Sequence, residues 1–86
     1  MGLFIYFRSF NWGNSAKFEM TKLPSSQKII NALLKNGFIF VSQRGSHQKY
    51  RKDDKTVIVP VPRKEIPIGT FRSIIRQSGL SQNEFI

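Results

Sequence analysis

The central part of the sequence, residues 44–51, reads Arg44-Gly45-Ser46-His47-Gln48-Lys49-Tyr50-Arg51. A glycine followed by alternating residue types predicts a turn that leads into a β-strand. Side chains point alternately to the two faces of a strand, so Tyr50 lies on the face opposite to His47. Lys49 and Arg51 share the face of His47. Because a sheet in so small a domain is covered on one side only, we expect Tyr50 to join the core and the His47 face to stay open.

One helix and two further strands are predicted around this central strand. The helix begins at serines 25–26, ends at Asn36-Gly37 and carries its apolar stripe at Ile29, Ile30, Leu33 and Leu34. Residues 38–42 have the aromatic and β-branched bias of a strand, and residues 43–45 form the turn after it. Residues 52–55 supply a polar hairpin turn. Residues 56–59 form a third strand, which Pro60 stops.

A loop and a second helix complete the predicted domain. Residues 61–67 have prolines near both ends and therefore form a loop. The second helix carries its inward stripe at Phe71, Ile74, Ile75 and Ser78. Gly79-Leu80 resembles a Schellman stop, and residues 81–86 are too short for a helix that stands alone. The expected fold class is α+β, with an antiparallel three-stranded sheet and two helices on one of its faces.

Composition limits the chain to one small domain with a basic surface. It has 86 residues, with fourteen Lys and Arg against five Asp and Glu, a net charge of +9. A domain of this size has a modest core, and such a charge predicts a polyanionic partner, for which RNA or DNA fits best. Anionic membrane is a weaker candidate, because no apolar run is long enough to span and the basic residues are dispersed. The absence of cysteine excludes thiolate chemistry and disulfides.

The first 20 residues differ from the rest of the sequence. They hold six of the eleven aromatic residues, yet they show neither sustained alternation nor a helical stripe. We interpret residues 1–20 as a poorly packed extension, with Met20 as an alternative start, and residues 21–86 as the working domain. An extra edge strand is the alternative interpretation of this segment.

The only histidine, His47, is the candidate catalytic residue. With an unperturbed pKa of about 6.5, histidine can accept and donate protons near neutral pH. RNA carries its own nucleophile, the 2′-hydroxyl, so one base and cations that stabilise the phosphorane suffice for scission without a metal. The products would be a 2′,3′-cyclic phosphate and a 5′-hydroxyl. Neighbouring positive charge favours the neutral imidazole that this role needs, and Gly45 lets backbone N–H groups approach a phosphate. The predicted phosphate-binding residues are Arg44, Gly45, Ser46, Lys49, Arg51, Arg63 and Lys64.

Other functions remain open on the residues alone. A lone histidine among cations on a strand is also common in a passive nucleic-acid surface, which makes a non-catalytic RNA-binding module the main alternative. Carboxylate catalysis is disfavoured, because Asp53 and Asp54 are adjacent in a predicted turn and the other acidic residues are scattered. A DNA-binding regulator is disfavoured, because neither helix is basic along a full exposed face.

An ordered set of motifs between Thr21 and about Leu80 resembles a known family. The motifs are Asn36-Gly37-Phe38, residues 44–50, Val59-Pro60-Val61-Pro62 and residues 65–74. They resemble the HicA family, also called YcfA-like, whose members are small ribosome-independent mRNA interferases of type II toxin–antitoxin systems. The resemblance implies a fold like that of double-stranded-RNA-binding domains, in the order α-β-β-β-α, with His47 of the Gly-Ser-His motif as the catalytic residue. Val61 departs from the family, which often has a basic residue there.

The resemblance also implies partners. The substrate would be mRNA in single-stranded form, and a HicB-type antitoxin would cover the His47 face. The toxin would be cytoplasmic, monomeric in the absence of its antitoxin, and would need neither a cofactor nor a membrane.

Overall fold

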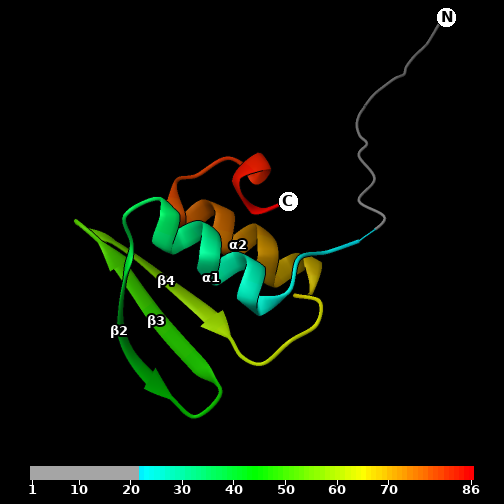
Figure 1. Cartoon of the computed structure of the whole chain (residues 1–86), viewed down its shortest axis with the longest axis horizontal. Helices are drawn as coiled ribbons and strands as arrows, with labels where there is room; N and C mark the ends of the chain where they lie inside the picture. The colour runs from blue at the N-terminus through cyan, green and yellow to red at the C-terminus, as the bar shows by residue number, and fades with distance from the viewer. Residues whose placement is uncertain (1–21) are drawn as a thin grey trace, which may run out of the picture.

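The computed structural model describes residues 22–86, so the predicted N-terminal extension lies outside the described residues. The elements, shown in Figure 1, are α1 (Ser26–Lys35), β2 (Ile39–Arg44), β3 (His47–Lys52), β4 (Lys55–Pro60), α2 (Ile68–Ser78) and the 3₁₀ turn η1 (Gln82–Phe85). This order confirms the predicted α-β-β-β-α arrangement. None of the helices in residues 22–86 has the length and apolar character needed to cross a bilayer.

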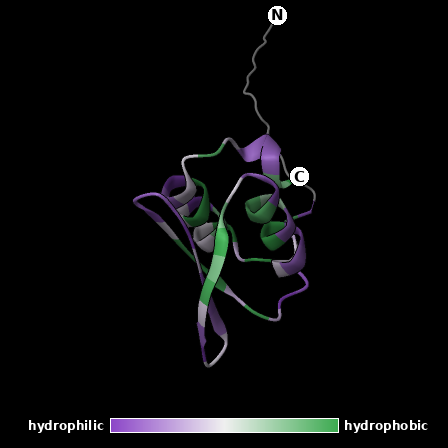
Figure 2. Ribbon diagram, turned by 60° about the vertical axis from the view of Figure 1, so that its left-hand side comes forward, coloured by the Kyte–Doolittle hydropathy of each residue, from purple (hydrophilic) through white to green (hydrophobic). Residues whose placement is uncertain are grey.

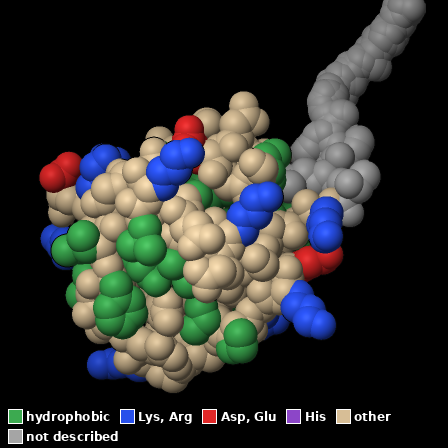
Figure 3. All heavy atoms as spheres, in the orientation of Figure 1, with side chains coloured by type: hydrophobic (Ala, Val, Ile, Leu, Met, Phe, Trp, Pro, Cys, Tyr) green, Lys and Arg blue, Asp and Glu red, His purple; other side chains and the backbone are tan. Residues whose placement is uncertain are grey.

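The three strands form one antiparallel sheet in the order β2-β3-β4, and both helices lie on the same side of it (Figure 1). Both helices contact β4, while β2 is the edge strand farthest from them. The first half of β2 is hydrophobic and its second half hydrophilic, as Figure 2 shows. Because the helices do not cover β2, Ile39, Phe40 and Val41 are 64%, 51% and 46% exposed. Hydrophobic side chains accordingly gather over the strand side of the surface in Figure 3.

Local hydrogen bonds explain where the helices begin and end. Ser25 caps α1 by accepting the Lys28 N–H at 3.1 Å, and the buried Ser26 hydroxyl donates to the Pro60 carbonyl at 2.6 Å. Gly79, with φ of +72°, ends α2 and donates its N–H to the Ile75 carbonyl. The Leu80 N–H donates to the Ser78 hydroxyl, so the stop is of the simpler left-handed type rather than a full Schellman motif.

Element boundaries and the first helical stripe differ slightly from the predictions. β2 continues to Arg44, two residues beyond the predicted end, and the turn therefore consists of Gly45 and Ser46. Leu34 is 50% exposed, although the apolar stripe predicts that it is buried. Its neighbours Ile30 and Leu33 already fill the line of contact with the core, and Leu34 lies one residue, about 100°, beyond Leu33 around the helix.

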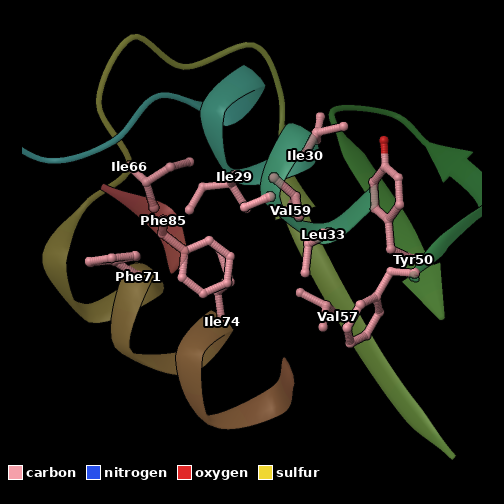
Figure 4. Packing of buried hydrophobic residues seen from close by; sticks show 12 residues of the cluster. Ile29, Ile30, Leu33, Tyr50, Val57, Val59, Ile66, Phe71, Ile74 and Phe85 are labelled. Carbon is pink, nitrogen blue, oxygen red and sulfur yellow. The ribbon is translucent and has the colours of Figure 1, made fainter. Parts of the chain in front are cut away.

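The core lies between the helices and the sheet, and Figure 4 shows its side chains. The buried hydrophobic residues are Ile29, Ile30, Ala32, Leu33, Phe38, Tyr50, Val57, Val59, Ile66, Phe71, Ile74 and Phe85. Tyr50 is buried as the alternation predicted. Phe85 is fully buried, and its ring meets that of Phe71 edge to face at 5.9 Å and 84°. The short C-terminal segment therefore depends on the core for its order and in turn closes one end of it.

We predict that Phe85→Ala lowers the free energy of unfolding by about 3–5 kcal/mol, because it leaves a cavity beside Phe71. Ile86 follows directly and is 52% exposed, so Ile86→Ala should change stability by no more than about 0.5 kcal/mol. Urea denaturation of the two variants measures the difference. Equal stability of the two variants would show that the C-terminal turn is not part of the cooperative core.

Candidate active site on the open face of the sheet

Three rows of cross-strand neighbours form the open face of the sheet. His47 has Arg44 opposite it on β2 and Pro60 opposite it on β4. The second row is Ser42, Lys49 and Ile58, and the third is Ile39, Arg51 and Thr56. Side chains directly opposite one another have Cβ atoms about 4.5–5.5 Å apart. The strand register therefore sets a guanidinium beside the imidazole of His47, with the Lys49 ammonium in the next row.

A β-bulge at Val41 puts Arg44 on this face. Phe40 pairs with Tyr50, whose side chain points to the core, and the register then shifts by one residue so that Ser42 pairs with Lys49. Side chains alternate along a strand, so without the shift Arg44 would lie on the same face as Phe40. The extra residue reverses the alternation and turns Arg44 towards His47. Bulges often re-aim side chains in this way beside functional sites.

The turn before His47 is held from both sides. Gly45 has a φ of +58°, which glycine adopts without strain. On the core side, the Tyr50 hydroxyl donates to Gln48 Oε1 at 2.7 Å, Gln48 Nε2 donates to Gln43 Oε1 at 3.0 Å, and Gln43 Nε2 donates to the Gly45 carbonyl at 2.9 Å. Burial raises the pKa of the Tyr50 hydroxyl further above neutral pH, and the protonated phenol is the donor with which the chain of hydrogen bonds starts.

The loop after β4 holds the other side of the turn. The Val61 N–H donates to the Ser46 carbonyl at 2.7 Å, and the Ser26 N–H donates to the Arg63 carbonyl at 3.0 Å. These bonds tie the turn that precedes His47 to the loop and, through the loop, to the start of α1. The position of His47 is therefore set by the core through hydrogen bonds from two directions.

Two hollows meet at His47. The cationic hollow has a volume of about 440 Å³ and is lined by Ser42, Arg44, His47, Gln48, Lys49 and Ile58. The second, which we call the α2 hollow, lies between β4 and α2 and has a volume of about 300 Å³. Its polar lining consists of His47, Arg63, Thr70, Ser73 and Gln77, and its apolar lining of Ile58, Pro60 and Pro67. His47 and Ile58 line both hollows and form the ridge between them.

The structure brings some of the predicted site residues together and separates others. Arg44, His47 and Lys49 share the cationic hollow, and Arg63 reaches the α2 hollow. Arg51 is on the same face one row farther away, where its Nε donates to the Asp53 carbonyl at 3.3 Å. Lys64 lines hollows near the beginning of α1, with Ser25, and lines neither of those at His47. Gly45 and Ser46 form the turn itself.

Three polar residues of α2 were missed by the sequence analysis. Thr70, Ser73 and Gln77 are spaced i, i+3 and i+7, so they share one side of the helix next to its buried stripe. The Oε1 atom of Gln77 accepts the N–H of Ile58 at 3.3 Å, which links α2 to the edge strand β4. The signal in the sequence is this line of polar residues directly beside the apolar stripe at Phe71, Ile74 and Ser78.

The charges around His47 are of one sign. No carboxylate among residues 22–86 lines either hollow, and no group in that range hydrogen-bonds to the imidazole. Nor do three His, Cys, Asp or Glu side chains of these residues gather where a metal ion could be held. The arrangement sets an imidazole beside two cations, a combination that can bind a phosphodiester and take a proton from a hydroxyl next to it.

Comparison with known proteins agrees with the motifs of the sequence. The family model described as the HicA toxin of bacterial toxin–antitoxin matches residues 26–80, while no curated protein matches the chain. The matched span includes both helices, all three strands, and the turn that presents His47. It covers well over half of the chain. In a toxin–antitoxin system a toxin is paired with an antitoxin that neutralises it. The chain belongs to the HicA family of bacterial toxins.

Proposed function

We propose that this chain is an endoribonuclease toxin that cleaves single-stranded mRNA without a metal, with His47 as the general base. One observation carries the proposal: an exposed imidazole lies directly opposite Arg44, and both line a hollow with Lys49. General bases must lie within hydrogen-bond reach of the proton that they remove, and an open face allows that approach. Membership of a toxin family is consistent with an activity that harms the cell.

The proposed reaction follows from the position of these groups. His47 takes the proton of the 2′-hydroxyl, and the 2′-oxygen attacks the adjacent phosphorus. Arg44 and Lys49 stabilise the negative charge that builds on the phosphorane oxygens. The bond to the 5′-oxygen breaks, and that oxygen takes up a proton from solvent. The products are a 2′,3′-cyclic phosphate and a 5′-hydroxyl. Gly45 and Ser46 contribute by fixing the turn that sets Arg44 at the phosphate and His47 at the adjacent 2′-hydroxyl.

Binding of a long RNA would extend beyond this centre. Arg51 lies on the same face and Arg63 at the edge of the α2 hollow, so both can contact phosphates of neighbouring nucleotides. Lys64 lies near α1 and would contact RNA only where the strand wraps around the loop. The alternative, an RNA-binding module without catalysis, uses the same surface and differs only in the fate of the bound strand.

We further propose that a HicB-type antitoxin neutralises the toxin by covering the His47 face. The cationic hollow has no acidic residue in its lining, so an acidic surface on the antitoxin would be complementary to it. The half-exposed residues Ile39 and Val41 of β2 adjoin this face and offer apolar contact to the same partner.

The first prediction from the proposed function concerns His47. His47→Ala should reduce RNA cleavage by about 10²–10⁴-fold, the usual contribution of a general base, while RNA binding and the thermal melt stay close to those of the unchanged protein. Thr56→Ala is the control, because Thr56 is on the same face and lines neither hollow. Single-turnover cleavage of a labelled RNA measures the loss. A fully active His47→Ala protein would remove this residue from the chemistry.

A comparison of two lysines on β3 distinguishes phosphate binding in the cationic hollow from the effect of net charge. Lys49 lines the cationic hollow, whereas Lys52 is on the opposite face, with its ammonium donating to the Asn36 carbonyl at 2.8 Å. Both substitutions to Ala remove one positive charge. We expect Lys49→Ala to weaken RNA binding and to slow cleavage, and Lys52→Ala to do neither. Equal effects at the two positions would mean that net charge alone holds the RNA.

The third prediction tests the nucleophile. An RNA with a single 2′-deoxy substitution at the cut site should resist cleavage there, because the attacking oxygen is gone. Chelator in the buffer should leave cleavage of the unmodified RNA unchanged. Product analysis should find the cyclic phosphate at the new 3′ end. Cleavage of the deoxy substrate at the substituted position would contradict the 2′-hydroxyl mechanism. Loss of cleavage of the unmodified RNA when chelator is added would contradict the absence of a metal.

The fourth prediction concerns the antitoxin. RNA and antitoxin should compete for the toxin, so the purified complex should bind RNA far more weakly than the free toxin does. Fluorescence anisotropy of a labelled RNA, titrated with toxin and with preformed complex, makes the comparison. If the complex cut RNA at the rate of the free toxin, the antitoxin would have to act elsewhere.

A further inference from the structure

The two hollows at His47 have different chemistry. The cationic hollow holds Arg44 and Lys49, which suit a phosphate. The α2 hollow has apolar walls from Ile58, Pro60 and Pro67, with neutral hydroxyl and amide groups from α2. Apolar walls with a few placed polar groups are typical of sites for flat organic ligands, and about 300 Å³ is at the lower end of their size range. Bases of single-stranded RNA are ligands of this kind.

We propose that the α2 hollow binds the nucleobase on the 5′ side of the cleaved bond, and that Thr70, Ser73 and Gln77 set the base preference. This inference rests on the proposed ribonuclease function and adds to it the site that reads sequence.

The order of atoms in a nucleotide supports the assignment. The ribose carries its base on C1′, the attacking hydroxyl on C2′ and the scissile phosphate on C3′. The hydroxyl therefore lies between the base and the phosphate. On the protein, His47 forms the ridge between the α2 hollow and the cationic hollow. A nucleotide with its phosphate near Arg44 and its base in the α2 hollow places the 2′-hydroxyl at the imidazole.

The polar groups of α2 have capacity left to recognise a base. Of the two ends of the Gln77 amide only the oxygen accepts hydrogen bonds, so the bond of 3.3 Å from the Ile58 N–H turns this oxygen towards β4. The amide nitrogen of Gln77 is then the end that can donate to an acceptor on a base edge. The Ser73 hydroxyl accepts a hydrogen bond from the Arg76 guanidinium at 3.4 Å and keeps its own proton to donate. The Thr70 hydroxyl can donate or accept, and the Arg63 guanidinium provides a plane on which a base can stack.

Substitutions that change hydrogen bonding without emptying the hollow test this site. Gln77→Glu keeps an oxygen for the Ile58 N–H and removes the amide donors, and Thr70→Val keeps the shape of the side chain. The substrate is a pool of single-stranded RNAs that differ only in the base 5′ of the cut, with cleaved ends counted by sequencing. We expect the ratio between bases to change by about threefold to tenfold, which corresponds to one neutral hydrogen bond.

The control is Gln27→Glu, which makes the same change of charge on the exposed face of α1. Gln27→Glu should leave the base ratios unchanged. A loss of rate that affects all RNAs in the pool equally does not alter these ratios. Wild-type protein that cleaves without a preference at this base, or variants that keep the wild-type ratios, would overturn the base site while leaving the ribonuclease proposal intact.

A second measurement does not depend on cleavage. Backbone amide resonances of the full chain are followed during titration with inorganic phosphate and, separately, with nucleoside 3′-monophosphates. Phosphate should shift resonances around Arg44 and Lys49, and the nucleotides should also shift those of Thr70, Ser73 and Gln77. Identical responses to the two ligands would overturn the proposal. A chain that bound nucleotides through α2 but cut no RNA would instead remove the catalytic proposal and leave the base site in place.

Discussion

The pairing of β2 with β3 is the constraint on which the candidate site depends. At Phe40 the pair is regular and contributes to the core side, where the rings of Phe40 and Tyr50 meet edge to face at 5.7 Å. One residue later the bulge at Val41 reverses the alternation, and Arg44 points to the open face beside His47. The same two strands therefore contribute to the core at one end and to the candidate site at the other. The register between them shifts at a single residue, Val41.

The core reaches the site through hydrogen bonds as well as through register. The Tyr50 hydroxyl, Gln48 and Gln43 form a chain that ends on the Gly45 carbonyl, two residues before His47. The Val61 N–H holds the Ser46 carbonyl from the opposite side. A side chain whose backbone is held in this way loses little entropy when substrate binds, which is the physical basis of preorganised sites. The exposed position of His47 is therefore compatible with a defined geometry.

The division of the sheet into a covered and an open face suits a small toxin. With both helices on one side, a domain of this size forms one core and still leaves a complete sheet face for a substrate or an antitoxin. Charge of one sign around His47 would attract the RNA of the proposed reaction and, by the same physics, an acidic antitoxin. Competition between the two partners would then follow from their shared need for the cationic hollow.

The sequence by itself determined the element order, the burial of Tyr50, the open position of His47 and, through its motifs, the family, because alternation, caps and apolar stripes are local properties. Tertiary structure decided the rest. The bulge at Val41 depends on how two strands pair, and the burial of Phe85 depends on its contact with Phe71. The polar residues Thr70, Ser73 and Gln77 line a hollow only because α2 packs beside β4. These features arise from contacts between different elements, and the local pattern of one element does not specify how it meets another.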